Sequence, residues 1–198
     1  MNLIKNNVIR EIISWCLYLG GAVLIAFVIS RYIIVHAQVV SGSMESTIMT
    51  YDKVIGFRLA YVLSEPQRGD IIMFHPPDGV TPRRSELTDY NNGTIEENET
   101  DVPYVKRIIG LPGDTIDIKD GLVYINGAEE PYDESAYLRV TPIRSFGPFE
   151  VPEDMYFVMG DNRNNSSDSR HWRNTFVPRE SIISRIFVRI YPNPSLLR

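Results

Sequence analysis

Two serines in the first quarter of the chain, Ser41 and Ser43, have a spacing that could support acyl transfer. They follow the run VHAQVV and are separated by Gly42. Side chains of an extended segment alternate between its faces, so both hydroxyls are expected to point the same way. One could attack a carbonyl carbon while the other donates to the oxyanion that forms beside it. A Ser-Gly-Ser string is more often a simple turn, so this interpretation needs a base.

The candidate base is Lys106, which stands in an otherwise apolar β pattern. Alternation puts Lys106 on the same face as Tyr104 and Ile108, and puts Arg107 on the other face. Burial disfavours the charged ammonium, and lowering the pKa of a lysine from ~10.4 to about 8 corresponds to about 3 kcal/mol. Such a lysine is a usable base near neutral pH, whereas the guanidinium of Arg107 stays protonated. The plain alternative is a solvated lysine on an edge strand.

A third polar segment, GDNRNNSSDSR at residues 160–170, is too dense in charged and amide groups for an ordinary loop. Its acids and arginines can pair among themselves, and its asparagines favour turns. A calcium loop is the competing interpretation. It fails because Arg163 stands where such a loop places Asp or Asn, and no glycine or terminal glutamate follows at the needed spacing.

Composition excludes several other chemistries. The only cysteine, Cys16, lies in an apolar run, which leaves no internal disulfide, cysteine zinc site or cysteine nucleophile. The net charge of −5 gives no basic stripe for nucleic acid. The sequence has no G-x-S-x-G, H-E-x-x-H, or S-x-x-K with K-T-G. A Ser-His-Asp triad through His75 or His171 stays open.

The segment before the serines is a candidate membrane anchor. Residues 12–30 carry no charge, and at ~1.5 Å per residue a helix of this length reaches about 28 Å, close to the ~30 Å hydrocarbon core. A buried core helix is one alternative. A cleaved secretory signal is another, with Lys5 and Arg10 before the apolar run and a small-x-small site at residues 35–37, although such apolar regions usually have ~7–15 residues. The flanking charges do not fix the orientation.

After residue 36 the pattern changes to short β-like runs separated by turns, which predicts an all-β domain. A hairpin turn is expected at residues 119–121 and another turn at 126–127. Residues 76–103 are polar and largely acidic, and are expected to form an exposed excursion. The predicted strands are Lys53–Phe57, Asp70–Phe74, Tyr104–Ile109, Thr115–Lys119, Leu122–Ile125, Met155–Met159 and Ile182–Ile190.

Together these segments resemble the sequence boxes of bacterial type I signal peptidases. SGSM with the following Thr47 resembles the nucleophile box, RGDIIMF a short structural box, YVKRIIGLPGD the lysine box, and GDNRNNSSDSR the last box. One box would be weak, but four in this order after an apolar segment are specific. The departure is Ser46, where the family usually has proline, which leaves the rigidity of this loop open.

The resemblance implies a role for each matching residue. Ser43 is the nucleophile and Lys106 the general base. The Ser41 hydroxyl completes the oxyanion hole beside the Ser43 N–H, and Ser166 orients the lysine amine. The other implied positions are a supporting Asp168–Arg170 salt bridge, a scaffold of Asp161, Arg163 and Arg107, and a pocket for small substrate side chains near Val39, Met44, Tyr104 and Val105.

The implied fold is mainly antiparallel β. A tail at residues 1–11 would be cytoplasmic, 12–35 the transmembrane anchor, and 36–198 an extracytoplasmic peptidase domain with a small cap at 115–150. The implied activity is that of signal peptidase I, a serine endopeptidase that removes N-terminal signal peptides from secretory preproteins. It would cut after small residues at −1 and −3 through an acyl-enzyme on Ser43.

We therefore expect a monomer in the cell membrane whose partners are secretory preproteins and the lipid bilayer, without metal, cofactor or nucleic acid. Two alternatives remain open: another Ser-Lys protease such as a self-cleaving repressor, and a catalytically silent β-domain that binds polypeptides at the membrane. The small residues at 35 and 37 also raise the hypothesis that one molecule cleaves another after Ala37.

Overall fold

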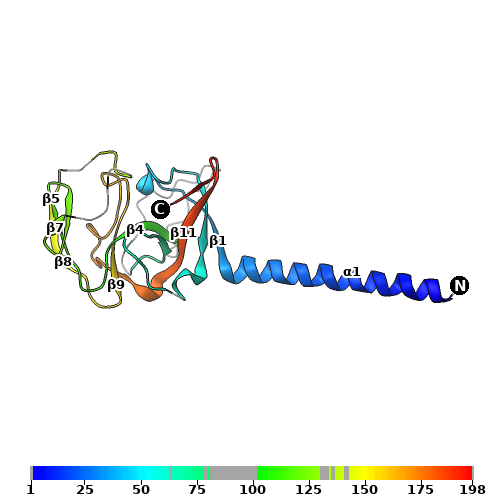
Figure 1. Cartoon of the computed structure of the whole chain (residues 1–198). Coiled ribbons are helices and arrows are strands. Elements are labelled where there is room, and N and C mark those ends of the chain that lie inside the picture. The colour runs from blue at the N-terminus through cyan, green and yellow to red at the C-terminus, as the bar shows by residue number, and fades with distance from the viewer. Residues whose placement is uncertain are drawn as a thin grey trace.

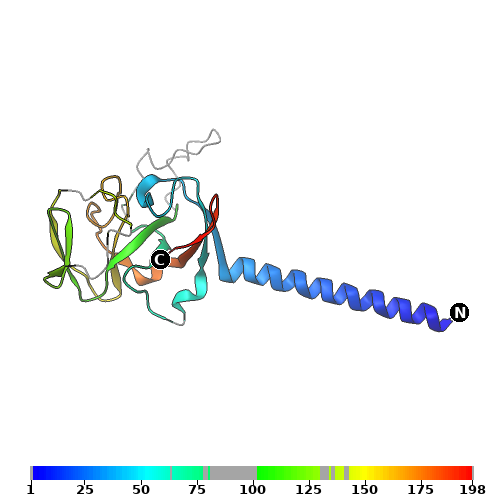
Figure 2. The same ribbon diagram turned by 45° about the horizontal axis from the view of Figure 1, so that its top comes forward.

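The computed structural model describes residues 2–62, 64–77, 80, 102–129, 134, 137–140 and 143–197. One long helix projects from a β body, as Figures 1 and 2 show from two directions. Helix α1 (Asn2–Val28) continues through a π-helical turn, η1 (Ile29–Ile33), into strand β1 (Ile34–Gln38). Helical structure thus ends two residues before the expected anchor boundary at residue 35. Most of the excursion predicted at 76–103 lies outside the described residues.

From Ile12 onward the projecting helix has no charged side chain up to Ser30, and its apolar side chains are exposed. Trp15 and Tyr18 are each 73% exposed, and Leu17 and Leu19 are each 69% exposed. Within the described residues, one stretch, Arg10–Ile33, is long and apolar enough to cross a membrane, and none of its most apolar part is buried inside the protein. A helix that is apolar all round needs an apolar environment of its own. The buried core helix considered above is therefore excluded.

Within the described part of the chain, eight antiparallel strands form the main sheet, in the order β1–β2–β11–β3–β4–β9–β10 with β12 paired to β11. Besides β1, these strands are β2 (Lys53–Phe57), β3 (Ile71–Phe74), β4 (Tyr104–Gly110), β9 (Met155–Met159), β10 (Val177–Pro178), β11 (Ile182–Tyr191) and β12 (Ser195–Leu196). Short 3₁₀ helices interrupt the connections at η2 (Gly42–Met44), η3 (Arg58–Tyr61) and η6 (Arg179–Ser181).

The centre of this sheet is covered on both faces. In β3, Ile72 and Phe74 belong to one hydrophobic cluster, whereas Ile71 and Met73 belong to another. Successive side chains of a strand point to opposite faces, so a strand covered on both sides reads as an unbroken apolar run. Strand β4 pairs with β3 and places Lys106 opposite Ile72. The fold therefore carries a lysine into the middle of a buried sheet.

A second sheet lies at the end of the body away from α1 (Figure 1). In the described residues it has the order β7–β6–β5–β8, with β5 (Thr115–Lys119), β6 (Leu122–Ile125), β7 (Ala128–Glu129) and β8 (Phe146–Glu150). Strands β5 and β6 form the predicted hairpin, whose turn residues Asp120 and Gly121 both have positive φ, as a two-residue hairpin turn requires.

Two strands were not predicted although they are five residues long. Strand β8 has the sequence FGPFE, in which Gly147 and Pro148 argue against a strand. It forms an edge of the second sheet, where proline is tolerated because one side of the strand makes no ladder bonds. Strand β1 directly follows the apolar helix, and its apolar residues Ile34 and Val35 continue the apolar pattern of that helix, so the sequence has no separate strand signal there.

Candidate active site

Ser43 and Lys106 contact each other and are both buried. The Lys106 Nζ lies 2.6 Å from the Ser43 Oγ and donates a hydrogen bond to it. Ser43 is only 2% exposed and Lys106 only 3% exposed. Lys106 comes from β4 and lies 5.4 Å from the centre of the Tyr104 ring, on the face that alternation predicts. The candidate nucleophile and the candidate base, 63 positions apart in the chain, are thus in direct contact.

Ser41 completes a row of three polar groups, but by a different backbone path from the one expected. The Ser41 Oγ and Ser43 Oγ lie 3.1 Å apart. The expectation of an extended segment is wrong here: Ser41 is extended, with φ −117° and ψ 151°, but Gly42–Met44 form the 3₁₀ helix η2. The turn, not strand alternation, brings the two hydroxyls together.

The turn that carries Ser43 is held by Asn162, for which the sequence indicated only a turn preference. The Asn162 backbone N–H donates to the Ser43 carbonyl oxygen at 3.0 Å, and its side-chain amide donates to the Gly42 carbonyl oxygen at 2.9 Å. Two bonds from one residue thus fix the carbonyl groups of the two peptides that flank the Ser43 Cα. Only the dense polar composition of residues 160–170 hinted at such a role.

Gly160 is packed against the same turn. A Cβ atom at this position would lie 2.3 Å from the Ser43 carbonyl oxygen and 2.3 Å from the Ser166 Oγ. Real Cβ atoms do not approach backbone oxygen so closely, so any larger residue must displace the Ser43 backbone. In the sequence, Gly160 stood out only as the first residue of the last box.

Ser166 lies next to Gly160, but its hydroxyl is not bonded as expected. It is 4% exposed, and among the described residues its Oγ makes no hydrogen bond of ordinary geometry. The Asp168 carboxylate is close enough for this hydroxyl to help lower its pKa. The hydrogen bond to the lysine amine that the resemblance implies is therefore not formed in this structure. A buried hydroxyl without a well-placed partner is costly, which makes Ser166 a group that a rearrangement or a bound molecule would satisfy.

Asp168 and Arg170 form a buried two-point ion pair behind the site. The Arg170 Nε and Nη2 each donate to one Asp168 carboxylate oxygen at 2.8 Å, and the Gly160 N–H donates to the same group at 3.0 Å. Burial alone would raise the pKa of Asp168, but hydrogen bonds and charge from Arg170 outweigh it and hold that pKa well below its ordinary value. Asp168 therefore remains ionised and ties down the loop that begins at Gly160.

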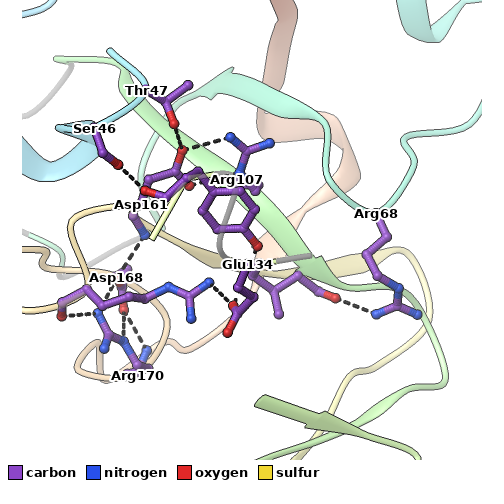
Figure 3. A network of polar contacts seen from close by, with 12 residues as sticks. Ser46, Thr47, Arg68, Arg107, Glu134, Asp161, Asp168 and Arg170 are labelled. Atoms are coloured by element: carbon purple, nitrogen blue, oxygen red, sulfur yellow. Dashed lines mark hydrogen bonds and ion pairs between the residues drawn. The ribbon is translucent and has the colours of Figure 1, made fainter. Parts of the chain in front are cut away.

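Asp161 and Arg163 do not pair with each other. Asp161 accepts from the Arg107 Nε at 2.8 Å and from its Nη2 at 2.7 Å, and also from the Thr47 hydroxyl at 2.5 Å. The Arg163 Nη2 instead donates to Glu134 at 2.5 Å. Figure 3 shows Thr47, Arg107 and Asp161 on one side of this network, with Glu134 and the Asp168–Arg170 pair on the other. No feature of the sequence had singled out Glu134.

Three of the four predicted pocket positions share one hydrophobic cluster. Val39 and Met44 are buried there, and Val105 packs against them from β4. Tyr104 belongs to the other cluster, where its ring lies 6.3 Å from Phe74. Met44 is completely buried. The apolar surroundings of Ser43 therefore come from both faces of the main sheet.

The structure also bears on two other kinds of site, a metal centre and a Ser-His-Asp triad. Within the described ranges no group of three or more His, Cys, Asp or Glu side chains is arranged to hold a metal ion. His171, one of the two candidates for a triad, lies 3.7 Å from Asp168 through its Nδ1 and packs edge-on against Phe146. The Ser43 hydroxyl, by contrast, accepts a hydrogen bond from the Lys106 amine at 2.6 Å.

Comparison with known proteins gives consistent matches over most of the chain. The sequence model of a family described as "Signal peptidase, peptidase S26" matches residues 12–191. A probable signal peptidase I-2 of Synechocystis is 39% identical over 173 residues, which make up 87% of this chain and 70% of that protein. Signal peptidase I S of Bacillus subtilis is 33% identical over 193 residues, 92% of this chain and 91% of that one. The crystal structure of a signal peptidase I from Enterococcus faecalis, 31% identical, matches 61% of this chain and 95% of that one with a TM-score of 0.41.

Proposed function

Because this chain belongs to the signal peptidase family, peptidase S26, we propose that Ser43 and Lys106 are the catalytic dyad with which it works. Its function is that of a signal peptidase I, a hydrolase that acts on secretory preproteins. The observation that carries the dyad is the 2.6 Å hydrogen bond between the Lys106 Nζ and the Ser43 Oγ, with both residues buried. Burial of a lysine disfavours its charged form, which is the direction that a general base requires.

The steps of the reaction follow from this contact. Ser43 Oγ attacks the scissile carbonyl carbon while its proton passes to the Lys106 Nζ. The tetrahedral intermediate collapses, the C–N bond breaks, and the leaving amine takes the proton from Lys106. Lys106 then removes a proton from a water molecule, which attacks the acyl carbon. The C–O bond to Ser43 breaks, the Ser43 Oγ takes the proton back from Lys106, and the new carboxylate is released.

The developing oxyanion needs donors that are in place before the reaction. We assign these to the Ser43 N–H and to the Ser41 hydroxyl, whose oxygen lies 3.1 Å from the Ser43 Oγ. Ser166 is the candidate for orienting the lysine amine, because its buried hydroxyl makes no well-formed hydrogen bond among the described residues. We assign a supporting role to the buried ion pairs next to the site, which involve Arg107, Asp161, Arg163, Asp168 and Arg170.

The substrate would bind as an extended strand, with backbone hydrogen bonds for affinity and small pockets for alternate side chains. We assign the pocket for small side chains to four apolar residues from the two hydrophobic clusters of the main sheet, Val39, Met44, Tyr104 and Val105. Such surroundings favour alanine-sized side chains at −1 and −3 over larger ones. The substrates are secretory preproteins cut at the end of their signal peptides.

The apolar helix gives the enzyme its place in the cell. Residues Arg10–Ile33 can span the hydrocarbon core once. We propose a single-pass protein with residues 1–11 in the cytoplasm, the anchor at 12–35, and the domain of residues 36–198 on the extracytoplasmic face, acting as a monomer. A short link between anchor and Ser43 holds the nucleophile near the lipid surface, where a signal peptide ends.

Cleavage of a preprotein by the detergent-solubilised full chain tests the dyad. Ser43→Ala and Lys106→Ala should each abolish cleavage, because the two residues act as one unit. Lys106→Arg should also be inactive, since a guanidinium does not release its proton. The wild-type rate should rise with pH as the amine deprotonates, through an apparent pKa below ~10.4.

Variants of the two histidines serve as the matched comparison in the same assay. His75→Ala and His171→Ala should retain cleavage. Near-normal rates in Lys106→Ala combined with loss in either histidine variant would show that the base is a histidine. A flat rate profile between pH 6 and 10 would also speak against a lysine base.

A further inference from the structure

One turn from the β7–β8 connection reaches across to the ion pairs behind the dyad. Its described residues are Glu134, Tyr137 and Leu138, which we call the tyrosine turn. The Tyr137 and Leu138 N–H groups donate to the Glu134 carbonyl oxygen at 3.1 and 2.6 Å. The Glu134 carboxylate accepts from the Arg163 Nη2 at 2.5 Å, which ties the turn to the segment that follows Gly160.

The Tyr137 ring lies close to two arginines of the scaffold. Its centre is 4.3 Å from the Arg107 guanidinium carbon and 5.9 Å from that of Arg163. Tyr137 is 9% exposed. A guanidinium over a desolvated aromatic face is attracted by the ring, so the tyrosine turn holds Arg107 and Arg163 at once. Arg107 follows Lys106 directly in β4, on the opposite face of the strand.

The backbone of the same turn is bonded to the nucleophile loop. The Ser46 hydroxyl donates to the Tyr137 carbonyl oxygen, and the neighbouring Thr47 hydroxyl donates to Asp161 at 2.5 Å. Figure 3 shows Ser46 and Thr47 side by side at this junction. The Thr47 N–H and the Ile48 N–H both donate to the Met44 carbonyl oxygen. These backbone hydrogen bonds form a turn directly after Ser43, and Ser46 lies within this turn.

Ser46 has an unusual backbone conformation for a residue other than glycine, with φ of +94°. Residues with a Cβ rarely adopt positive φ, and a surrounding structure must hold them there. Here a bond from the side chain of Ser46 to the tyrosine turn supplies such a constraint. Proline, whose ring locks φ near −65°, cannot adopt this conformation.

We propose that Ser46 and the tyrosine turn are positioning elements for the nucleophile: together they fix the Ser43 loop relative to strand β4, which carries Lys106. The contact between base and nucleophile depends on the relative placement of these two elements, and the tyrosine turn binds both of them. This inference rests on the proposed dyad. It assigns to the β7–β8 connection, outside the main sheet, a part in aligning Ser43.

Steady-state cleavage by the full-length protein in detergent tests the proposal, with the folded fraction of each variant measured by thermal unfolding. Ser46→Gly keeps the backbone conformation, because glycine adopts positive φ freely, but it removes the hydroxyl. We expect kcat to fall by about tenfold to a hundredfold, the scale of a small misplacement of reacting groups, with KM nearly unchanged. Ser46→Pro should lose more activity than Ser46→Gly.

The ring of Tyr137 is tested in parallel. Tyr137→Leu removes the aromatic face and should lower kcat to a similar extent, whereas Tyr137→Phe keeps the face and should retain most of the rate. Ser64→Gly is the matched control, because the exposed Ser64 hydroxyl also donates to a backbone carbonyl, that of Ala60, at 2.7 Å. This control should cleave at the wild-type rate.

Wild-type kcat in folded Ser46→Gly or Tyr137→Leu would overturn the proposal. So would losses that merely follow the unfolded fraction, that appear only in KM, or that are equally large in Ser64→Gly. Ser43→Ala is measured beside them, because activity remaining in that variant would refute the dyad itself. An inactive Ser43→Ala together with fully active Ser46→Gly and Tyr137→Leu would refute only the positioning role.

Discussion

At the residue scale, the contribution of Ser41 can be separated from that of the nucleophile. Its hydroxyl oxygen lies 3.1 Å from the Ser43 Oγ, within reach of an oxyanion that forms there. Ser41→Ala should leave Ser43 able to attack but remove one oxyanion donor, which costs about 10²–10³ in kcat. Ser41→Thr keeps a hydroxyl and should keep much of the rate. Equal kcat for Ser41→Ala and the wild type would reduce Ser41 to a turn residue.

Asp168 allows a prediction about stability and pH. Its pKa is lowered in the folded protein, because the hydrogen bonds and charge of Arg170 outweigh the opposing effect of burial. A lowered folded-state pKa stabilises the fold at every pH above the unfolded-state value of about 3.9, and this stabilisation is lost as the pH falls from there toward the folded-state pKa. The wild type should therefore lose stability as the pH is lowered from 5 through 3.

Asp168→Asn should weaken this pH dependence and lower the free energy of unfolding at pH 7 by about 3–5 kcal/mol, because it leaves Arg170 buried without its charge partner. Denaturant unfolding at pH 7 and pH 3 measures both effects. Asp117→Asn is the control, since its partner Lys119 is 66% exposed and that pair should matter little. A loss in Asp117→Asn as large as that in Asp168→Asn would contradict the assignment.

At the element scale, strand β4 performs two tasks because its side chains alternate. One face carries Lys106 to the Ser43 hydroxyl, and the other carries Arg107 to Asp161. The segment that begins at Gly160 contacts this strand through the bond between Asp161 and Arg107. The same segment supports the Ser43 turn through the Asn162 N–H, which donates to the Ser43 carbonyl oxygen. The dyad distance is therefore set by the packing of three chain segments rather than by any one of them.

The close approach of Gly160 to the Ser43 turn gives a test at this scale. Gly160→Ala would put a methyl group 2.3 Å from the Ser43 carbonyl oxygen, so the turn must shift and cleavage should be nearly lost. Gly127→Ala is the control: Gly127 has φ of +78°, but no atom lies within 4 Å of the place that a Cβ would take. It should lose about 1–2 kcal/mol of stability and keep its cleavage rate.

At the scale of the whole molecule, the structure bears on the hypothesis of cleavage after Ala37. Ala37 lies within β1, paired in register with Val54 of β2. A peptide bond held in a sheet cannot enter the active site of another molecule unless β1 first separates from β2. We therefore expect the Met1 terminus to persist during prolonged incubation of the concentrated enzyme in detergent.

N-terminal sequencing over time measures this, with Ser43→Ala as the control for contaminating proteases. A new terminus at Gln38 in the wild type, absent from Ser43→Ala, would show that β1 detaches readily. The same terminus in both proteins would point to a contaminant instead.

The sequence by itself determined the features that depend on near neighbours in the chain. An uncharged run at residues 12–30 identified the apolar helix. Alternation placed Lys106 and Arg107 on opposite faces, and the predicted bounds of β2, β5, β6 and β9 agree with the structure residue for residue. The order of the boxes indicated the family, which the comparisons confirm. The helix, the strands and each single box are signals contained in a short stretch of residues, and the order of the boxes is read directly along the chain.

Only the tertiary structure decided which distant groups meet. Arg107 finds Asp161 across 54 positions, and Ser46 finds Tyr137 across 91. Spacing along the chain predicts neither pair, because the partner of a buried charge or hydroxyl is selected by how the two sheets and their connections pack. For the same reason the 3₁₀ turn at Ser43 was missed: bonds from Asn162, more than a hundred residues away, help to hold it.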